Sequence, residues 1–241
     1  IKPSFISQVA VDTIDALSFA FARFSLNIAF AAEAISVELL LQSQVHVLLV
    51  SLLSSQTEFS IGPAALALTH ISLHPRMKAE IVMTGLLPRA FEILTHTQSP
   101  AIQIQICKLL ASVALLPANR SRLAEVGLIR TLLSLIQAKQ TKRRAPNAVA
   151  ECVAKALANV TFGSQSNKSI LVDLNGIETL LSAAAFYQEK DTIACGVHAI
   201  ANVAYFHELA GNRAMSAHAD QILSDCLEST DITADMNIPM I

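Results

Sequence analysis

The sequence contains no Trp and only seven Gly and eight Pro among its 241 residues. A sheet protein needs many tight turns, and so few Gly and Pro cannot supply them. Charged residues make up 15% of the chain, well below the roughly one quarter that is usual. Apolar residues reach 53%, and Ala and Leu, which dominate them, both favour helix. These counts predict an all-helical chain with a sizeable core and exclude a disordered one.

Long apolar runs are also missing. A membrane-spanning helix needs about 20 predominantly apolar residues, but the best candidate stretch, from Leu26 to Leu41, is interrupted by Glu33 and Glu38. We therefore expect no membrane span and no signal peptide. The net charge of −2 gives no reason to expect nucleic acid as a partner.

Close-spaced cysteine pairs are absent as well, which favours reduced thiols packed inside helices. Such thiols are typical of a cytoplasmic or nuclear compartment. The four cysteines are Cys107, Cys152, Cys195 and Cys226.

Catalytic and metal-binding signatures are lacking too. No Gly-rich phosphate loop occurs, and His207-Glu208 begins a zinc-protease motif that fails because Gly211 stands where a second His is needed. His70 and His74 lie one helical turn apart, but no third metal ligand accompanies them. We therefore predict that the chain is not an enzyme and holds no cofactor or metal.

What the sequence does contain is a repeat. A Gly opens an apolar helix at Gly85, Gly127 and Gly176, at intervals of 42 and 49 residues. Glycine tolerates positive φ, so each of these positions suits a sharp bend between two short helices.

A second pattern repeats in register with the first. It is an apolar helical stretch around one polar position, as in Ala156-Leu157-Ala158-Asn159-Val160, and the polar positions are separated by 43, 42, 47 and 43 residues. The longest step contains an insertion over 139–146, rich in Lys, Arg and Gln. The five polar anchors are Asn27, His70, Ser112, Asn159 and Asn202.

A third pattern is an Asn followed by a basic residue, seven to ten residues after an anchor, at Asn119-Arg120, Asn167-Lys168 and Asn212-Arg213. Asn is a good helix N-cap, so each pair is predicted to start the next short helix. The unit is then a short helix, a Gly bend, a medium helix, a polar turn and a long helix. In the fourth unit we expect these helices at about 119–126, 128–138 and 147–161.

Three helices in a period near 42 residues resemble the armadillo repeat. The resemblance implies an all-α, right-handed α-solenoid of armadillo-type repeats. HEAT-like repeats are the alternative, against which the Gly bend and the third helix argue. We expect one armadillo-repeat domain over 1–228, with about four full repeats plus partial terminal repeats, followed by an irregular tail over 229–241.

In the armadillo family the third helices line a concave groove that holds an extended peptide, and an Asn there hydrogen-bonds the peptide backbone. Asn27, Asn159 and Asn202 match that position. His70 and Ser112 depart from it, although both side chains can still form hydrogen bonds. The resemblance therefore implies a protein-interaction scaffold or adaptor.

One helical turn before each anchor lies a neighbouring groove position. Importin-alpha proteins place Trp there, and because this chain has none, an importin-like transport receptor is a disfavoured alternative. The basic residues resemble instead the groove of beta-catenin, which predicts an acidic or phosphorylated extended segment of a partner protein. The five positions hold Arg23, Leu66, Lys108, Lys155 and His198.

Other interpretations stay open at this point. The low charge content also suits a structural subunit of a larger assembly held by apolar surfaces. Lys142-Arg143-Arg144 is either a solvated insertion or a basic targeting patch. The aromatic residues Phe30, Phe162 and Tyr205 each follow an anchor by three residues, and we predict that they pack between repeats.

Overall fold

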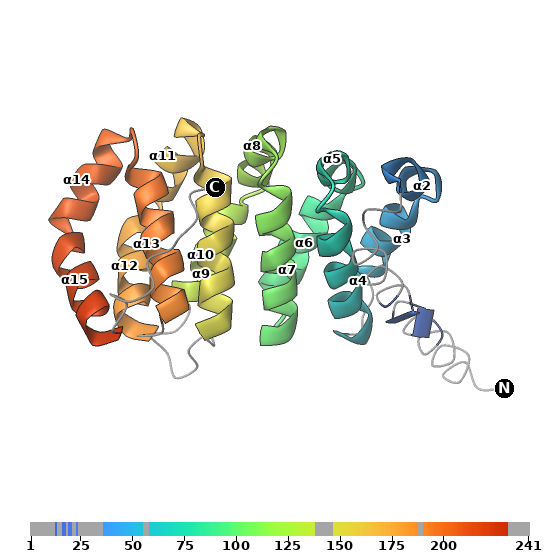
Figure 1. Cartoon of the computed structure of the whole chain (residues 1–241), viewed down its shortest axis with the longest axis horizontal. Helices are drawn as coiled ribbons and strands as arrows, with labels where there is room; N and C mark the ends of the chain where they lie inside the picture. The colour runs from blue at the N-terminus through green and yellow to red at the C-terminus, as the bar shows by residue number, and fades with distance from the viewer. Residues whose placement is uncertain are drawn as a thin grey trace. The chain divides into compact units, whose positions relative to one another are not determined.

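The computed structural model describes residues 36–54, 58–137, 147–187 and 190–230, together with six single residues between 13 and 23. The chain divides into two compact units, residues 1–122 (unit 1) and residues 123–241 (unit 2). Helices make up the regular structure of the described segments (Figure 1). The all-α fold predicted from composition is therefore confirmed.

Unit 1 repeats a pattern of two shorter helices followed by a longer one. Its long helices, α4 and α7, each supply the third helix of a repeat, and α8 crosses the boundary between the units. The helices are α2 (Val37–Gln42), α3 (Val45–Leu52), α4 (Glu58–Ile71), α5 (Pro75–Met83), α6 (Leu86–His96), α7 (Pro100–Val113) and α8 (Pro117–Glu125).

Unit 2 continues the same pattern, with α10 and α13 as its third helices. The fourth repeat follows the predicted bounds closely, since its three helices run over 117–125, 128–137 and 147–161. The remaining helices are α9 (Leu128–Gln137), α10 (Asn147–Thr161), α11 (Gln165–Asp173), α12 (Gly176–Tyr187), α13 (Lys190–Ala204), α14 (Glu208–Ser216) and α15 (Ala219–Thr230).

Third helices of neighbouring repeats pack on each other within each unit, α4 on α7 and α10 on α13. The same repeat position fills the core each time, two residues before the polar anchor. Leu68 and Leu110 occupy it in unit 1, and Leu157 and Ile200 in unit 2, all buried. Burying one such side chain contributes about 1.5–3 kcal/mol. A single repeat has no partner for this face, so the repeats must stack.

The bend between the first two helices of a repeat has a left-handed residue every time. Gly85 (φ 97°) and Gly127 (φ 78°) fill this role as predicted. In the next repeat the left-handed residue is Asn175 (φ 56°), while Gly176 is already the first residue of α12. Glycine is needed at 176 for space, because a Cβ there would lie 2.8 Å from the carbonyl oxygen of Leu171.

The Asn-basic pairs do not cap the short helices, so the prediction made for them is wrong. Helix α8 begins two residues before Asn119, and the N-cap of α11 is Ser164, whose hydroxyl accepts from the backbone N–H of Asn167. The Asn119 amide is buried and donates to the carbonyl oxygens of Val113 (2.9 Å) and Lys78 (3.0 Å). The carbonyl groups at the end of a third helix have no partner inside that helix, and this Asn satisfies one of them.

Asn167 has the same role in unit 2, where its amide donates to the carbonyl oxygen of Val160, 2.9 Å away at the end of α10. Two of the basic residues also donate to carbonyl oxygens at the ends of third helices. Arg120 donates to the carbonyl oxygen of Ala114 (3.0 Å), at the end of α7, and Lys168 donates to that of Tyr205, just after the end of α13. Cations placed at helix carboxyl ends also complement the helix dipole.

Helix α15 ends at Thr230, two residues inside the tail predicted over 229–241, and residues 231–241 lie outside the described part of the chain. The single domain over 1–228 remains a prediction. Within the described residues no single helix is long and apolar enough to cross a membrane, although the bent pair Gln165–Asp173 and Gly176–Phe186 passes a test of length and composition.

Candidate functional site

The third helices of unit 2 expose a stripe of side chains at positions one turn before the anchor, at the anchor and three residues after it. The first two positions share one helix face, because 3.6 residues complete a turn, and the third lies just after the helix end. In the repeat of α10 the stripe consists of Lys155 (exposed) and Asn159 (half-buried) on the helix and Phe162 (exposed) in the turn after it. In the repeat of α13 the matching residues are His198 and Asn202 on the helix and Tyr205 in the turn after it, with the same burial. We call these six residues the unit 2 face.

Lys155 is not a free cation. Its Nζ forms an ion pair with Oε1 of Glu151, one turn earlier on α10, at 2.5 Å. Burial is the largest single influence and opposes the charge of Lys155, but the hydrogen bond to Glu151 and the electrostatic influence of Cys195, Glu151 and Cys152 together outweigh it, so the pKa of Lys155 is raised above its ordinary value. The lysine is therefore cationic at neutral pH, and its field is partly offset by a neighbour that the repeat pattern did not identify.

In unit 1, Lys108 is exposed on α7 as the sequence predicted, and Ser112 follows one turn later, half-buried. The hydroxyl oxygen of Ser112 lies 2.6 Å from that of the buried Ser72, which follows the end of α4. Ser112 thus joins neighbouring third helices, and a peptide would have to share this hydroxyl with Ser72.

The remaining predicted residues of unit 1 are placed as follows. Leu66 and His70 are half-buried on α4, and Arg23 is exposed in a helical segment. Asn27 lies outside the described residues, as does the basic stretch over 142–144. His70 and His74 belong to no cluster of three or more potential metal ligands within the described segments.

The cysteines Cys107 and Cys152 are buried, and Cys195 is half-buried. Burial raises the pKa of Cys195 to about 11, although the nearby Lys155 acts in the opposite direction. Because the thiolate is the reactive form, Cys195 is inert at neutral pH. This environment suits a small packing residue in the repeat.

The prediction that the aromatic residues pack between repeats is wrong for the two that the structure describes. Phe162 is 51% exposed and Tyr205 is 66% exposed, and Phe30 lies outside the described residues. Three residues past an anchor, the chain has already reached the end of its third helix, so the side chain leaves the core. The same position holds exposed apolar residues in unit 1, Leu73 and Leu115.

One cluster escaped the sequence analysis, at the turn between α13 and α14. Tyr205 and Phe206 contact each other, with ring centroids 4.3 Å apart and planes inclined by 53°. The Lys168 ammonium lies 5.8 Å from the centroid of the Tyr205 ring. The sequence signal for this cluster was that Phe206 directly follows Tyr205, which stands at a position that recurs in the repeats.

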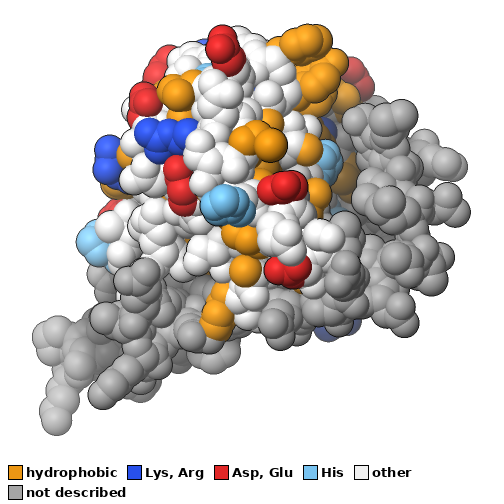
Figure 2. Space-filling model, turned by 90° about the vertical axis from the view of Figure 1, so that its left-hand side faces the viewer, with side chains coloured by type: hydrophobic (Ala, Val, Ile, Leu, Met, Phe, Trp, Pro, Cys, Tyr) orange, Lys and Arg blue, Asp and Glu red, His pale blue; other side chains and the backbone are white. Residues whose placement is uncertain are grey.

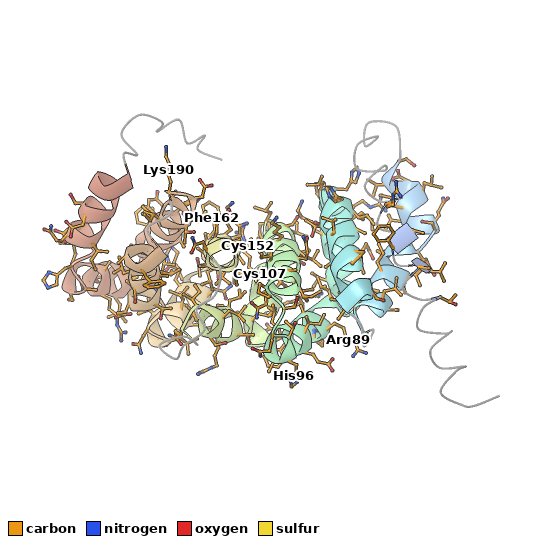
Figure 3. All side chains as sticks on the ribbon, turned by 90° about the horizontal axis from the view of Figure 1, so that it is seen from below. Arg89, His96, Cys107, Cys152, Phe162 and Lys190 are labelled. Carbon is orange, nitrogen blue, oxygen red and sulfur yellow. The ribbon has the colours of Figure 1, made fainter. Side chains whose placement is uncertain are left out.

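The exposed side chains are distributed unevenly over unit 2. In Figure 3, Phe162 and Lys190 extend on the side lined by α10 and α13. Figure 2 faces the end formed by α14 and α15, where acidic and basic side chains are interspersed among hydrophobic ones.

Solved structures support the fold assignment. An engineered protein has 20% identity and a TM-score of 0.78, with coverage of 91% of this chain and 88% of that chain. A designed armadillo repeat protein in complex with the peptide (KR)4 has 18% identity and a TM-score of 0.68, covering 95% and 87%. Computationally designed armadillo repeat proteins for modular peptide recognition have 17% identity and a TM-score of 0.71, covering 92% and 97%.

No curated protein matches the chain. A protein family does match, and it is described as the GAC ARM domain, over residues 74–236. That span runs from the end of α4 through α15 and includes the complete repeats with α7, α10 and α13 as third helices. The match agrees with the helix pattern, the left-handed bends and the solved structures, and the chain therefore belongs to the GAC ARM domain family.

Proposed function

We propose that this chain is a protein-interaction module that binds an extended acidic segment of a partner protein on its third helices. The observation that carries the proposal is that Lys108 and Lys155 stand exposed at the same repeat position of α7 and α10, one turn before a half-buried polar anchor. Designed armadillo proteins built for peptide recognition share the fold.

The chemistry of the face fits this ligand. An extended peptide leaves its backbone N–H and C=O groups without partners, and amide side chains such as Asn159 and Asn202 can both donate to and accept from them. Such contacts are independent of the peptide's sequence, so specificity must come from the neighbouring positions. Lysine there favours carboxylate or phosphate groups.

The contrast with the neighbour bound to (KR)4 is informative. That designed protein is in complex with a basic peptide, whereas this chain has arginine, lysine or histidine at four of the five described positions that precede an anchor. We infer opposite charge selectivity. The Lys155–Glu151 ion pair reduces this selectivity for acidic ligands, because a ligand carboxylate must compete with Glu151 for the same ammonium.

The test uses a labelled peptide of alternating Asp and Ser, measured by fluorescence polarisation against the whole chain. Lys108→Glu combined with Lys155→Glu should weaken binding at least about tenfold, which is ~1.4 kcal/mol. Binding of the unmutated chain should also weaken as salt is raised, because exposed charges are screened.

A matched control carries the same change in charge away from the third helices. Arg89 on α6 and Arg130 on α9 are both exposed, so Arg89→Glu with Arg130→Glu should leave binding within about twofold, since only the screened long-range field changes. Equal affinity of the lysine variant and the unmutated chain, with circular dichroism unchanged, would refute the proposal. Equal loss in both variants would show a bulk-charge effect and refute it too.

A further inference from the structure

The turn between α13 and α14 exposes an aromatic pair that folding alone does not explain. Tyr205 is 66% exposed and Phe206 is 79% exposed. The two rings contact each other, so they present one continuous apolar surface. Large apolar side chains placed together on a surface commonly mark an interaction site.

The backbone conformation of Phe206 also indicates an interaction site at this turn. Its φ of 53° lies in the left-handed region, where a bulky residue is a genuine outlier. The matching residue in the preceding turn is Gly163, which has nearly the same φ of 64°. Glycine adopts this left-handed conformation without strain. Phe206 adopts it at an energetic cost to the backbone, and its ring is exposed to solvent as well. Strained residues of this kind concentrate at functional sites.

The charge beneath the pair suggests which ligand fits. Lys168 is buried, lies 5.8 Å from the centroid of the Tyr205 ring and donates to the Tyr205 carbonyl oxygen. That acceptor is neutral, so the contact leaves the positive charge of the ammonium in place. Burial lowers the pKa of Lys168, which reflects the cost of holding a cation there. An acidic segment bound across the aromatic pair would reduce that cost through the field of its carboxylates.

We propose that Tyr205 and Phe206 seat an aromatic or large aliphatic side chain of the same acidic segment that the unit 2 face binds. This inference rests on the proposed function and adds a specificity to it. Side chains of an extended chain point alternately to opposite edges. Tyr205 lies at the carboxyl end of the stripe and His198 at the other. The recognised pattern is therefore an apolar residue directly beside an acidic one.

Three labelled peptides test this pattern by fluorescence polarisation. The first alternates Asp and Ser, the second has one central Ser replaced by Phe, and the third exchanges that Phe with its neighbouring Asp. The second should bind at least about tenfold more tightly than the first, because burying a Phe ring is favourable by more than the ~1.4 kcal/mol that corresponds to tenfold. The third should lose most of that gain, since its Phe points to the other edge.

The decisive variant is Phe206→Gly, because Gly163 already occupies the equivalent position. This substitution should remove the gain in affinity that the peptide's Phe provides and leave the affinity for the Asp-Ser peptide unchanged. Its thermal midpoint should be equal to or above that of the unmutated chain, because glycine relieves the left-handed strain. Phe91→Ala is the control, since Phe91 is also exposed but lies on α6, and it should keep the gain.

The outcomes separate this inference from the function on which it rests. Equal binding of the first two peptides would overturn the aromatic seat and leave the acidic-segment proposal standing. A lower thermal midpoint for Phe206→Gly, with the gain from Phe retained, would assign Phe206 to the fold and overturn the seat as well. Failure of all three peptides to bind would overturn both proposals.

Discussion

Replacing Asn119 by Ala should cost unit 1 about 2–3 kcal/mol of unfolding free energy, a magnitude that follows from its contacts. The Asn119 side chain is 3% exposed, and its amide donates to two carbonyl oxygens, those of Val113 and Lys78. Each such hydrogen bond contributes about 0.5–1.5 kcal/mol net, and an acceptor left buried without a partner costs about as much or more. The substitution removes both bonds and adds only a better helix propensity.

The matched control is Asn212→Ala. Asn212 occupies the same place in the sequence pattern, but the structure places it exposed within α14. Surface substitutions of this kind change stability by no more than about 0.5 kcal/mol. An N-cap role, as the sequence suggested, would instead cost about 1 kcal/mol at both positions.

The measurement is urea unfolding followed by far-ultraviolet circular dichroism, with amide exchange of α5 and α7 to assign the loss to unit 1. Local assignment is needed because repeat proteins unfold in part through their repeats. Losses that agree within error for Asn119→Ala and Asn212→Ala would refute the reasoning from buried acceptors.

Three further predictions concern packing and pH. Gly176→Ala should destabilise unit 2 by about 1–3 kcal/mol, because its Cβ would lie 2.8 Å from the Leu171 carbonyl oxygen. Gly211→Ala should stabilise it by up to about 1 kcal/mol, because a Cβ at this helical position meets nothing within 4 Å; thermal unfolding of the two variants checks both signs. His46 is buried, and desolvation lowers its pKa below 6.5 although Glu80 acts in the opposite direction. The unfolded chain then binds more protons, so unit 1 should lose stability as pH falls from 6.5 towards the lowered pKa. His46→Leu should flatten that part of the pH profile, and an unchanged slope would contradict the assignment.

The helices and their order were accessible from the sequence because they depend on local patterns. Leu68, Leu110, Leu157 and Ile200 recur in step with the polar anchors, and that periodicity specifies which face of each third helix is buried. The bends at Gly85 and Gly127 were equally predictable from the sequence, since glycine is the usual residue for positive φ. The left-handed conformation of Asn175 was not predicted, because Asn tolerates this conformation but is a weaker indicator of it than glycine.

The site was predicted only in part. Lys108 and Lys155 stand exposed where the repeat placed them, but the Glu151–Lys155 ion pair and the Ser72–Ser112 hydrogen bond were not foreseen. Both depend on which rotamers and which neighbouring helices come together. A repeat pattern gives the position of a residue and does not give its partner.

By itself, the sequence determined an all-helical chain of three-helix repeats, because helix periodicity and repeat length are written in the order of residues. Only the tertiary structure decided what the repeated side chains do. It turned Asn119 and Asn167 from helix caps into buried donors to the preceding third helix, and it moved Phe162 and Tyr205 from the core to the surface. The physical reason is that hydrogen-bond partners and exposure depend on elements distant in the sequence, which meet only when the repeats stack.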